Sequence, residues 1–122
     1  MEPLLVMQTA TWLLVITALG GLAMAGIRFG QNKNPPSWLA MLHGFLAGAA
    51  ITLLLYAALT VGLPRMAVWA LVLFLLAAAG GVFLNLGYQL KNLPLPKAVV
   101  MVHAVIAVIG FVLLLTATFS RS

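Results

Sequence analysis

Four long apolar runs alternate with short polar breaks along this 122-residue chain. Each run has about 20 residues or more, which is the length that an α-helix needs to cross a bilayer. The breaks between them are polar and contain proline, as connections between helices often do: QNKNPP, VGLPR and KNLPLP. The pattern predicts an all-α, four-helix transmembrane bundle in one integral membrane domain over residues 1–122, with helices at about 8–29, 38–59, 66–90 and 98–119.

Composition supports lipid as the solvent for most of the surface. Hydrophobic residues make up 65% of the chain and charged residues 6%, and the mean hydropathy is +1.21, which is too apolar for a soluble domain of this size. The first run does not resemble a secretory signal peptide, because Glu2 precedes it in place of a basic segment and it is too long. The chain has no cysteine, which excludes disulfides and thiol chemistry.

The basic residues predict an orientation and need no nucleic-acid partner. The net charge of +5 is spread over membrane-flanking positions with no basic tract. The first and third connections carry four of these charges: Arg28, Lys33, Lys91 and Lys97. Arg65 and Arg121 lie at the opposite end with Glu2. The positive-inside rule therefore places the first and third connections in the cytoplasm. We expect a multi-pass protein of the bacterial inner membrane with both termini on the periplasmic side.

The two halves of the sequence align with each other at a displacement of 60 residues. The informative matches are Gly20 with Gly80, Gly21 with Gly81, Asn32 with Asn92, Pro36 with Pro96, Met41 with Met101 and His43 with His103. Such self-similarity predicts a tandem duplication of a two-helix hairpin, with repeats at about residues 1–62 and 63–122. Each copy crosses the membrane twice, so the second and fourth helices run in the same direction and occupy one diagonal of the bundle.

The two histidines of the chain lie at matching depths. Each follows its proline by seven residues, which is about 10 Å along a helix. The glycine pairs fall at the same level on the first and third helices. We therefore expect one layer near the cytoplasmic end, with two imidazoles on one diagonal and two glycine pairs on the other. Ionisable residues inside a span are candidates for a functional site.

This layer has three possible interpretations. Structural roles are possible: the glycines would allow close helix packing, and each histidine would hydrogen-bond to a hydroxyl or carbonyl. A bare zinc ion suits the layer poorly, because it needs about three or four protein ligands. Met41 and Met101 lie about 200° around the helix from the histidines and cannot add ligands. Haem suits the layer better, since its iron needs two axial ligands that neutral imidazoles supply. Its propionates would point to nearby polar groups: Arg28, Lys33, Lys97, Tyr88 and Asn32.

Histidines on the second and fourth helices, with glycines on the first and third, resemble the four-helix b-type cytochrome core of quinol-oxidising respiratory complexes. The resemblance implies that His43 and His103 are the axial ligands of the haem iron and that the glycines accommodate the haem edges: Gly20, Gly21, Gly80 and Gly81. That core carries two histidines on each ligand helix and stacks two haems. This chain has one histidine per helix, so we expect one haem b per chain.

The expected function is that of a small b-type cytochrome that transfers single electrons in the membrane. A quinone or a redox partner protein would exchange the electron. With both axial positions filled, electron transfer is favoured over catalysis. A non-enzymatic haem carrier or sensor, or a structural subunit of a larger membrane complex, is the alternative. Transport is disfavoured because the spans contain no carboxylate or lysine. A homodimer could form through remaining glycines, such as Gly44, Gly48 and Gly110.

Overall fold

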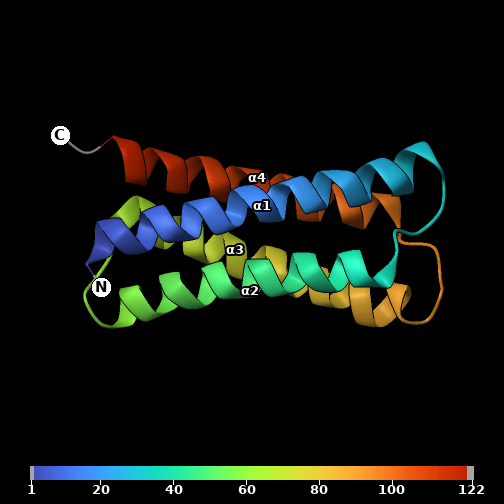
Figure 1. The fold of residues 1–122 in the computed structure, drawn as a ribbon, viewed down its shortest axis with the longest axis horizontal. Helices are drawn as coiled ribbons and strands as arrows, with labels where there is room; N and C mark the ends of the chain where they lie inside the picture. The colour runs from blue at the N-terminus through green and yellow to red at the C-terminus, as the bar shows by residue number, and fades with distance from the viewer. Residues whose placement is uncertain (1, 121–122) are drawn as a thin grey trace.

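The computed structural model describes residues 2–120, which form four long helices joined by short connections. The helices are α1 (Pro3–Gly30), α2 (Ser37–Leu59), α3 (Arg65–Leu84), which continues into the π-helical turn η1 (Asn85–Gln89), and α4 (Lys97–Phe119). They run up and down in one bundle (Figure 1), which confirms the prediction of four helices. Each is long and apolar enough to cross a membrane, as expected of a multi-pass membrane protein.

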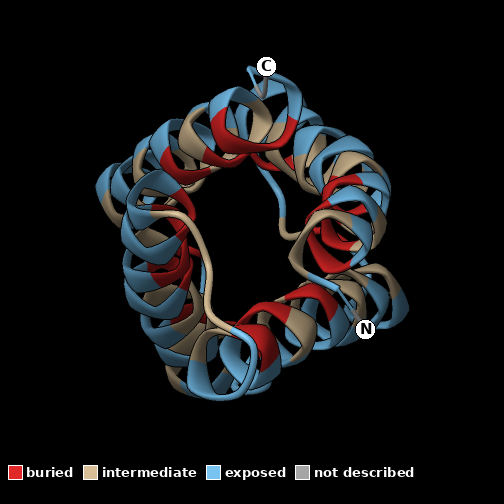
Figure 2. Ribbon diagram, turned by 90° about the vertical axis from the view of Figure 1, so that its left-hand side faces the viewer, coloured by how far each residue is buried: buried red, intermediate tan, exposed pale blue. Residues whose placement is uncertain are grey.

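The helices are arranged in a ring (Figure 2). Helices that follow one another in the chain are neighbours, and α4 packs beside α1. The helices α2 and α4 therefore lie on one diagonal and α1 and α3 on the other, as predicted. Packing within the hairpins α1–α2 and α3–α4 is more extensive than packing between the hairpins. We call the end that holds connections 31–36 and 90–96 the double-loop end, and the end that holds residues 2, 60–64 and 120 the terminal end.

The largest difference from the expected helix bounds is at the start of α1, which begins five residues before the expected position 8. Pro3 lies in its first turn, where the missing N–H of proline removes no hydrogen bond. Val6 and Met7 are buried in the bundle. Burial of these apolar side chains stabilises the added turn, which periodicity within the main apolar run did not indicate.

Proline and asparagine shape the connections at the double-loop end. Pro36 and Pro96 precede α2 and α4 with an extended backbone. The ring of proline fixes its own φ angle. It also disfavours a helical conformation of the residue before it. Asn32 and Asn92 have φ angles of 55° and 57°. Asparagine tolerates this left-handed region better than most residues do. Both chain reversals thus use the same residue types at positions 60 residues apart.

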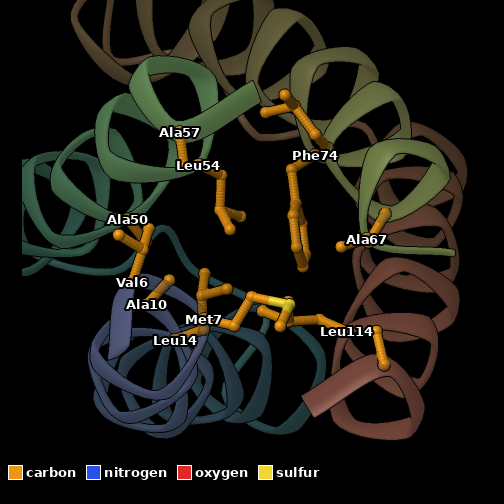
Figure 3. Packing of buried hydrophobic residues seen from close by; sticks show 13 residues of the cluster. Val6, Met7, Ala10, Leu14, Ala50, Leu54, Ala57, Ala67, Phe74 and Leu114 are labelled. Atoms are coloured by element: carbon orange, nitrogen blue, oxygen red, sulfur yellow. The ribbon is translucent and has the colours of Figure 1, made fainter. Parts of the chain in front are cut away.

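A packed apolar core fills the terminal half of the bundle. Met7, Leu54 and Leu114 are fully buried and Phe74 is 4% exposed, and these side chains point into the interior from all four helices (Figure 3). In contrast, no residue in the helical segments 18–27, 38–49, 78–83 and 98–109 is buried. Buried side chains therefore concentrate near the terminal end and are absent from the helices at the level of the histidines.

Polar side chains join the two hairpins at the double-loop end. Arg28 Nε donates a hydrogen bond to the Leu95 carbonyl at 2.8 Å, and Gln89 Nε2 donates to the Pro35 carbonyl at 2.7 Å. Asn34 makes two further hydrogen bonds to the backbone of the second connection. We call this set the polar clasp (Arg28, Asn34 and Gln89 with their backbone partners). It holds the hairpins together at the double-loop end, beyond the level of the histidines.

The π-helical turn shifts the second half by one residue relative to the first. Arg28 and Gln89 are 61 positions apart, whereas the two carbonyls that they bind are 60 apart. A π-turn closes i→i+5 hydrogen bonds and so accommodates about one extra residue, as η1 does here. Gln89, rather than Tyr88, therefore takes the place of Arg28 in the second half. Tyr88 packs edge-on against Phe83.

Candidate functional site

His43 on α2 and His103 on α4 lie close together across the bundle. Their ring centres are 6.3 Å apart and the ring planes meet at 66°. Both side chains are half-buried. The structure therefore brings together the two residues that were predicted to share a ligand, although 60 positions separate them in the chain.

Each imidazole is hydrogen-bonded to the main chain of its partner helix in the same hairpin. His43 Nδ1 lies 2.9 Å from the Thr17 carbonyl oxygen, and His103 Nδ1 lies 2.7 Å from that of Ala77. A carbonyl can only accept, so Nδ1 is the protonated nitrogen and the lone pair of the neutral ring lies on Nε2. Within residues 2–120, neither Nε2 has a hydrogen-bond partner. The structural interpretation thus accounts for one nitrogen of each ring and leaves the other available as a ligand.

The first glycine pair uncovers the carbonyl that His43 binds. In an α-helix the carbonyl of residue i points toward residues i+3 and i+4, which for Thr17 are Gly20 and Gly21. A Cβ on Gly21 would lie 3.0 Å from His43 Cε1, and a Cβ on Gly20 would lie 3.9 Å from Nδ1. The absence of side chains at both positions lets the imidazole reach the main chain of α1.

The second glycine pair repeats this arrangement around His103. Ala77 is followed at the same offsets by Gly80 and Gly81. Added Cβ atoms there would lie 3.6 Å from Nδ1 and 3.3 Å from Cε1 of the imidazole. Sequence reasoning placed these glycines in the histidine layer but missed their contact with the rings. The signal was the equal spacing of carbonyl, glycine pair and histidine in both halves.

The separation of the rings suits two imidazoles that share one metal ion. Metal–nitrogen bonds of about 2 Å, with about 1.1 Å from each nitrogen to its ring centre, put the centres about 6 Å apart in a linear arrangement. A hydrogen bond from the other ring nitrogen to a carbonyl is the usual outer contact of a metal-bound histidine. Residues 2–120 contain no group of three His, Cys, Asp or Glu side chains that could hold an ion. This donor set fits an iron whose other positions a porphyrin fills, and it does not fit bare zinc.

Arg28 lies at the double-loop end, seven residues beyond Gly21 along α1, or about 10 Å from the histidine layer. Its side chain is 8% exposed. The guanidinium donates through Nε to Leu95 and through Nη1 to Asn32 Oδ1 at 3.1 Å. The single acidic residue of the chain, Glu2, lies at the other end, so no carboxylate of the chain neutralises this charge. The C-terminal end of the α1 dipole offsets part of its cost.

The other polar groups proposed for the propionates lie at the same end with different surroundings. Lys97 lies over the ring of Phe29 at 5.9 Å, and Lys33 lines a shallow surface pocket between the two connections.

Met41 and Met101 are 46% and 52% exposed, so they face away from the interior as predicted.

The glycines suggested for dimerisation differ in their surroundings. Gly44 and Gly48 are exposed on α2, with no atom near an added Cβ. Gly110 is buried, and its added Cβ would lie 3.0 Å from Phe74 Cε1. The suggestion for Gly110 is therefore wrong, because this glycine packs inside its own bundle.

Sequence reasoning missed Gln89. This side chain is 6% exposed, and its Oε1 is the one buried side-chain polar atom without a hydrogen-bond partner among residues 2–120. The available signal was an amide one residue before the expected end of the third apolar run.

No known protein family, curated protein or solved structure matches the chain.

Proposed function

We propose that this protein is a small membrane b-type cytochrome, in which His43 and His103 hold the iron of one haem b and single electrons are transferred through it. The observation that carries the proposal is the close pair of imidazoles, with ring centres 6.3 Å apart, each with Nδ1 bonded to a carbonyl and with no partner for Nε2 among residues 2–120. Bound haem would supply a one-electron redox centre. Two protein ligands close the iron to substrates, which favours electron transfer.

The surrounding residues would orient and complete this site. The glycine pairs seat the imidazoles, and the hydrogen bonds from Nδ1 hold the rings in the tautomer that ligation needs. Arg28 would pair with a propionate at the double-loop end. A buried cation without a carboxylate partner is costly, and an anion from outside the chain would remove that cost.

We infer further that the two hairpins arose by tandem duplication, with repeats at about 1–62 and 63–122. Support comes from the recurrence of structure as well as of residues. The histidine–carbonyl bonds, the left-handed asparagines and the first residues of α2 and α4 all recur at a displacement of 60. The single offset, at Gln89, follows from the π-turn.

Packing in the terminal half supports one haem rather than two. Met7, Leu54, Phe74 and Leu114 fill the interior where a second cofactor layer would lie in the two-haem core that the sequence resembles. Electrons would therefore be exchanged at the double-loop end or through the side of the bundle. A membrane quinone or a redox partner protein would be the donor or acceptor.

The packed terminal half also favours a second candidate, a haem carrier or sensor. A single haem in one chain gives no continuous path for electrons across the membrane. The rate of haem release distinguishes the two functions. A carrier would lose haem rapidly to excess apomyoglobin, whereas an electron-transfer protein would retain it through repeated cycles of reduction and oxidation.

An absorbance spectrum of the detergent-purified protein, before and after dithionite, tests the main proposal. We expect a sharp Soret band, resolved α and β bands on reduction, and one haem per chain. A colourless protein that remains colourless when haem is supplied would refute the proposal. Two haems per chain would show that a ligand other than histidine has been missed.

We also propose that the protein lies in the bacterial inner membrane with the double-loop end in the cytoplasm. Support comes from the basic residues at that end: Arg28, Lys33, Lys91 and Lys97. At the other end, Arg65 begins α3, and Arg121 lies outside the described residues.

The absence of native cysteine makes this orientation easy to test. In intact spheroplasts, a membrane-impermeant maleimide should label a Val61→Cys variant at the terminal end and leave a Gln31→Cys variant at the double-loop end unlabelled. The reverse pattern would show that the orientation is inverted.

A further inference from the structure

Gln89 presents a buried hydrogen-bond acceptor that the chain does not satisfy. Its side chain is 6% exposed, Nε2 donates to the Pro35 carbonyl at 2.7 Å, and Oε1 has no partner among residues 2–120. The opposite orientation of the amide would bring two acceptors together, so the bond to Pro35 fixes Oε1 as the unpaired atom. A buried acceptor without a partner costs free energy, and a donor from outside the chain would relieve it.

Gln89 occupies the place of Arg28 in the other half of the bundle. Each side chain closes one seam between the hairpins, Arg28 from α1 to the start of α4 and Gln89 from the end of η1 to the start of α2. The π-turn brings Gln89 into this position. The double-loop end therefore carries one cationic group and one neutral acceptor in related positions, each about 10 Å beyond its glycine pair.

We propose that Gln89 accepts a hydrogen bond from a protonated carboxyl group of the bound haem, while Arg28 pairs with the ionised carboxylate. This inference rests on the proposed function, because haem carries the two carboxyl groups. An amide oxygen cannot pair with an ionised carboxylate, which has no proton to donate. Gln89 is thus a cofactor-binding residue that distinguishes the two carboxyls.

The charged and titratable groups around this end are few. Besides Arg28 on α1, they are Lys33 in the first connection, Tyr88 in η1, Lys91 in the second connection and Lys97 at the start of α4. The first turn of α2 contributes none, and the chain places no carboxylate here. The cations favour ionised carboxyls, whereas the unpaired oxygen of Gln89 favours the protonated form.

The test compares the affinities for haem and for haem dimethyl ester, measured by spectroscopic titration of the apoprotein. The ratio of the two affinities is determined for the wild-type protein, for Gln89→Met and for Asn34→Ala. The asparagine variant is the matched control, because it removes clasp hydrogen bonds and leaves Gln89 intact.

In mildly acidic buffer, Gln89→Met should lower the preference for haem over its ester by roughly 3- to 10-fold, the value of one hydrogen bond. In alkaline buffer this difference should disappear, because the carboxyl has ionised. Asn34→Ala should keep the wild-type ratio in both buffers. An unchanged ratio in the Gln89→Met protein would overturn the inference and indicate that water satisfies Oε1.

A second variant keeps the inference testable if the Gln89→Met protein does not fold. Gln89→Glu keeps an acceptor oxygen of the same reach, so it should preserve or raise the preference for the free acid in acidic buffer. Loss of that preference would also overturn the inference. Wild-type protein that binds neither haem nor its ester would instead refute the proposed function, and the inference with it.

Discussion

Replacing Gly21 with alanine should displace the His43 ring, whereas the same change at Gly20 should not. The new Cβ at Gly21 would lie 3.0 Å from His43 Cε1, which forces a shift of a few tenths of an ångström. At Gly20 the new Cβ would lie 3.9 Å from Nδ1, an ordinary van der Waals contact. The two variants are adjacent on one helix and chemically identical, so they form a matched pair.

The magnitude follows from three opposing effects. Alanine in place of glycine in a helix interior gains about 1 kcal/mol. Against this, overpacking costs about 1–3 kcal/mol, and the weakened hydrogen bond to Thr17 costs about 0.5–1.5 kcal/mol. The net loss at Gly21 is about 0.5–3.5 kcal/mol, which would lower haem affinity roughly 2- to 400-fold. At Gly20 only the helix gain applies, so the affinity should be retained and the thermal stability should rise slightly.

Titration of each apoprotein with haem in the same detergent, followed at the Soret band, measures the difference. Gly81→Ala should show a smaller loss than Gly21→Ala, because its Cβ would lie 3.3 Å from His103 Cε1. Equal haem affinities for the Gly20 and Gly21 variants would refute the view that these glycines seat the imidazole. Loss of folded protein in both variants would indicate a role in helix packing alone.

Four further substitutions test other parts of the structure. His43→Ala and His103→Ala should each abolish the low-spin haem spectrum, and added imidazole should partly restore it. Six-coordinate haem retained in either variant would contradict a ligand pair within one chain. Gly110→Ala overpacks against Phe74, at a net cost of about 0–2 kcal/mol after the helix gain of about 1 kcal/mol is deducted, so the melting temperature should not rise and the haem spectrum per folded chain should not change. A melting temperature raised by the full helix gain would contradict the described core. Asn34→Ala should lower thermal stability by about 1–3 kcal/mol through the loss of two clasp hydrogen bonds, and equal stability would show that water replaces them.

The sequence predicted the helices well because length and apolar composition are strong signals for membrane spans. Three of the four helices begin within one residue of the expected position. The approach of His43 to His103 was also predictable, since matching depth on parallel diagonal helices leaves few other arrangements. A carbonyl partner for each histidine was among the expectations, but the particular carbonyls, of Thr17 and Ala77, were not predicted. They depend on how closely the two helices of each hairpin pack and on which rotamer that packing allows.

The π-turn and the role of Gln89 could not be predicted from local sequence. The segment NLGYQ contains no residue that requires an i→i+5 hydrogen bond. The turn accompanies a tertiary contact, in which Gln89 reaches the Pro35 carbonyl of the other hairpin. Local patterns describe one helix at a time, so a one-residue offset that depends on a contact across the bundle is not visible in them.

The closer packing within each hairpin suggests an order of assembly for the bundle. The first hairpin leaves the ribosome before the second, and it contains both partners of the Thr17–His43 hydrogen bond. Independently inserted helices associate afterwards in the bilayer, so the close pair of histidines exists only once the hairpin with His103 has docked. A nascent chain that stops after α2 presents a single imidazole. If the protein binds haem as proposed, six-coordinate haem forms within one chain only on a finished bundle, which would make cofactor capture a checkpoint for complete synthesis.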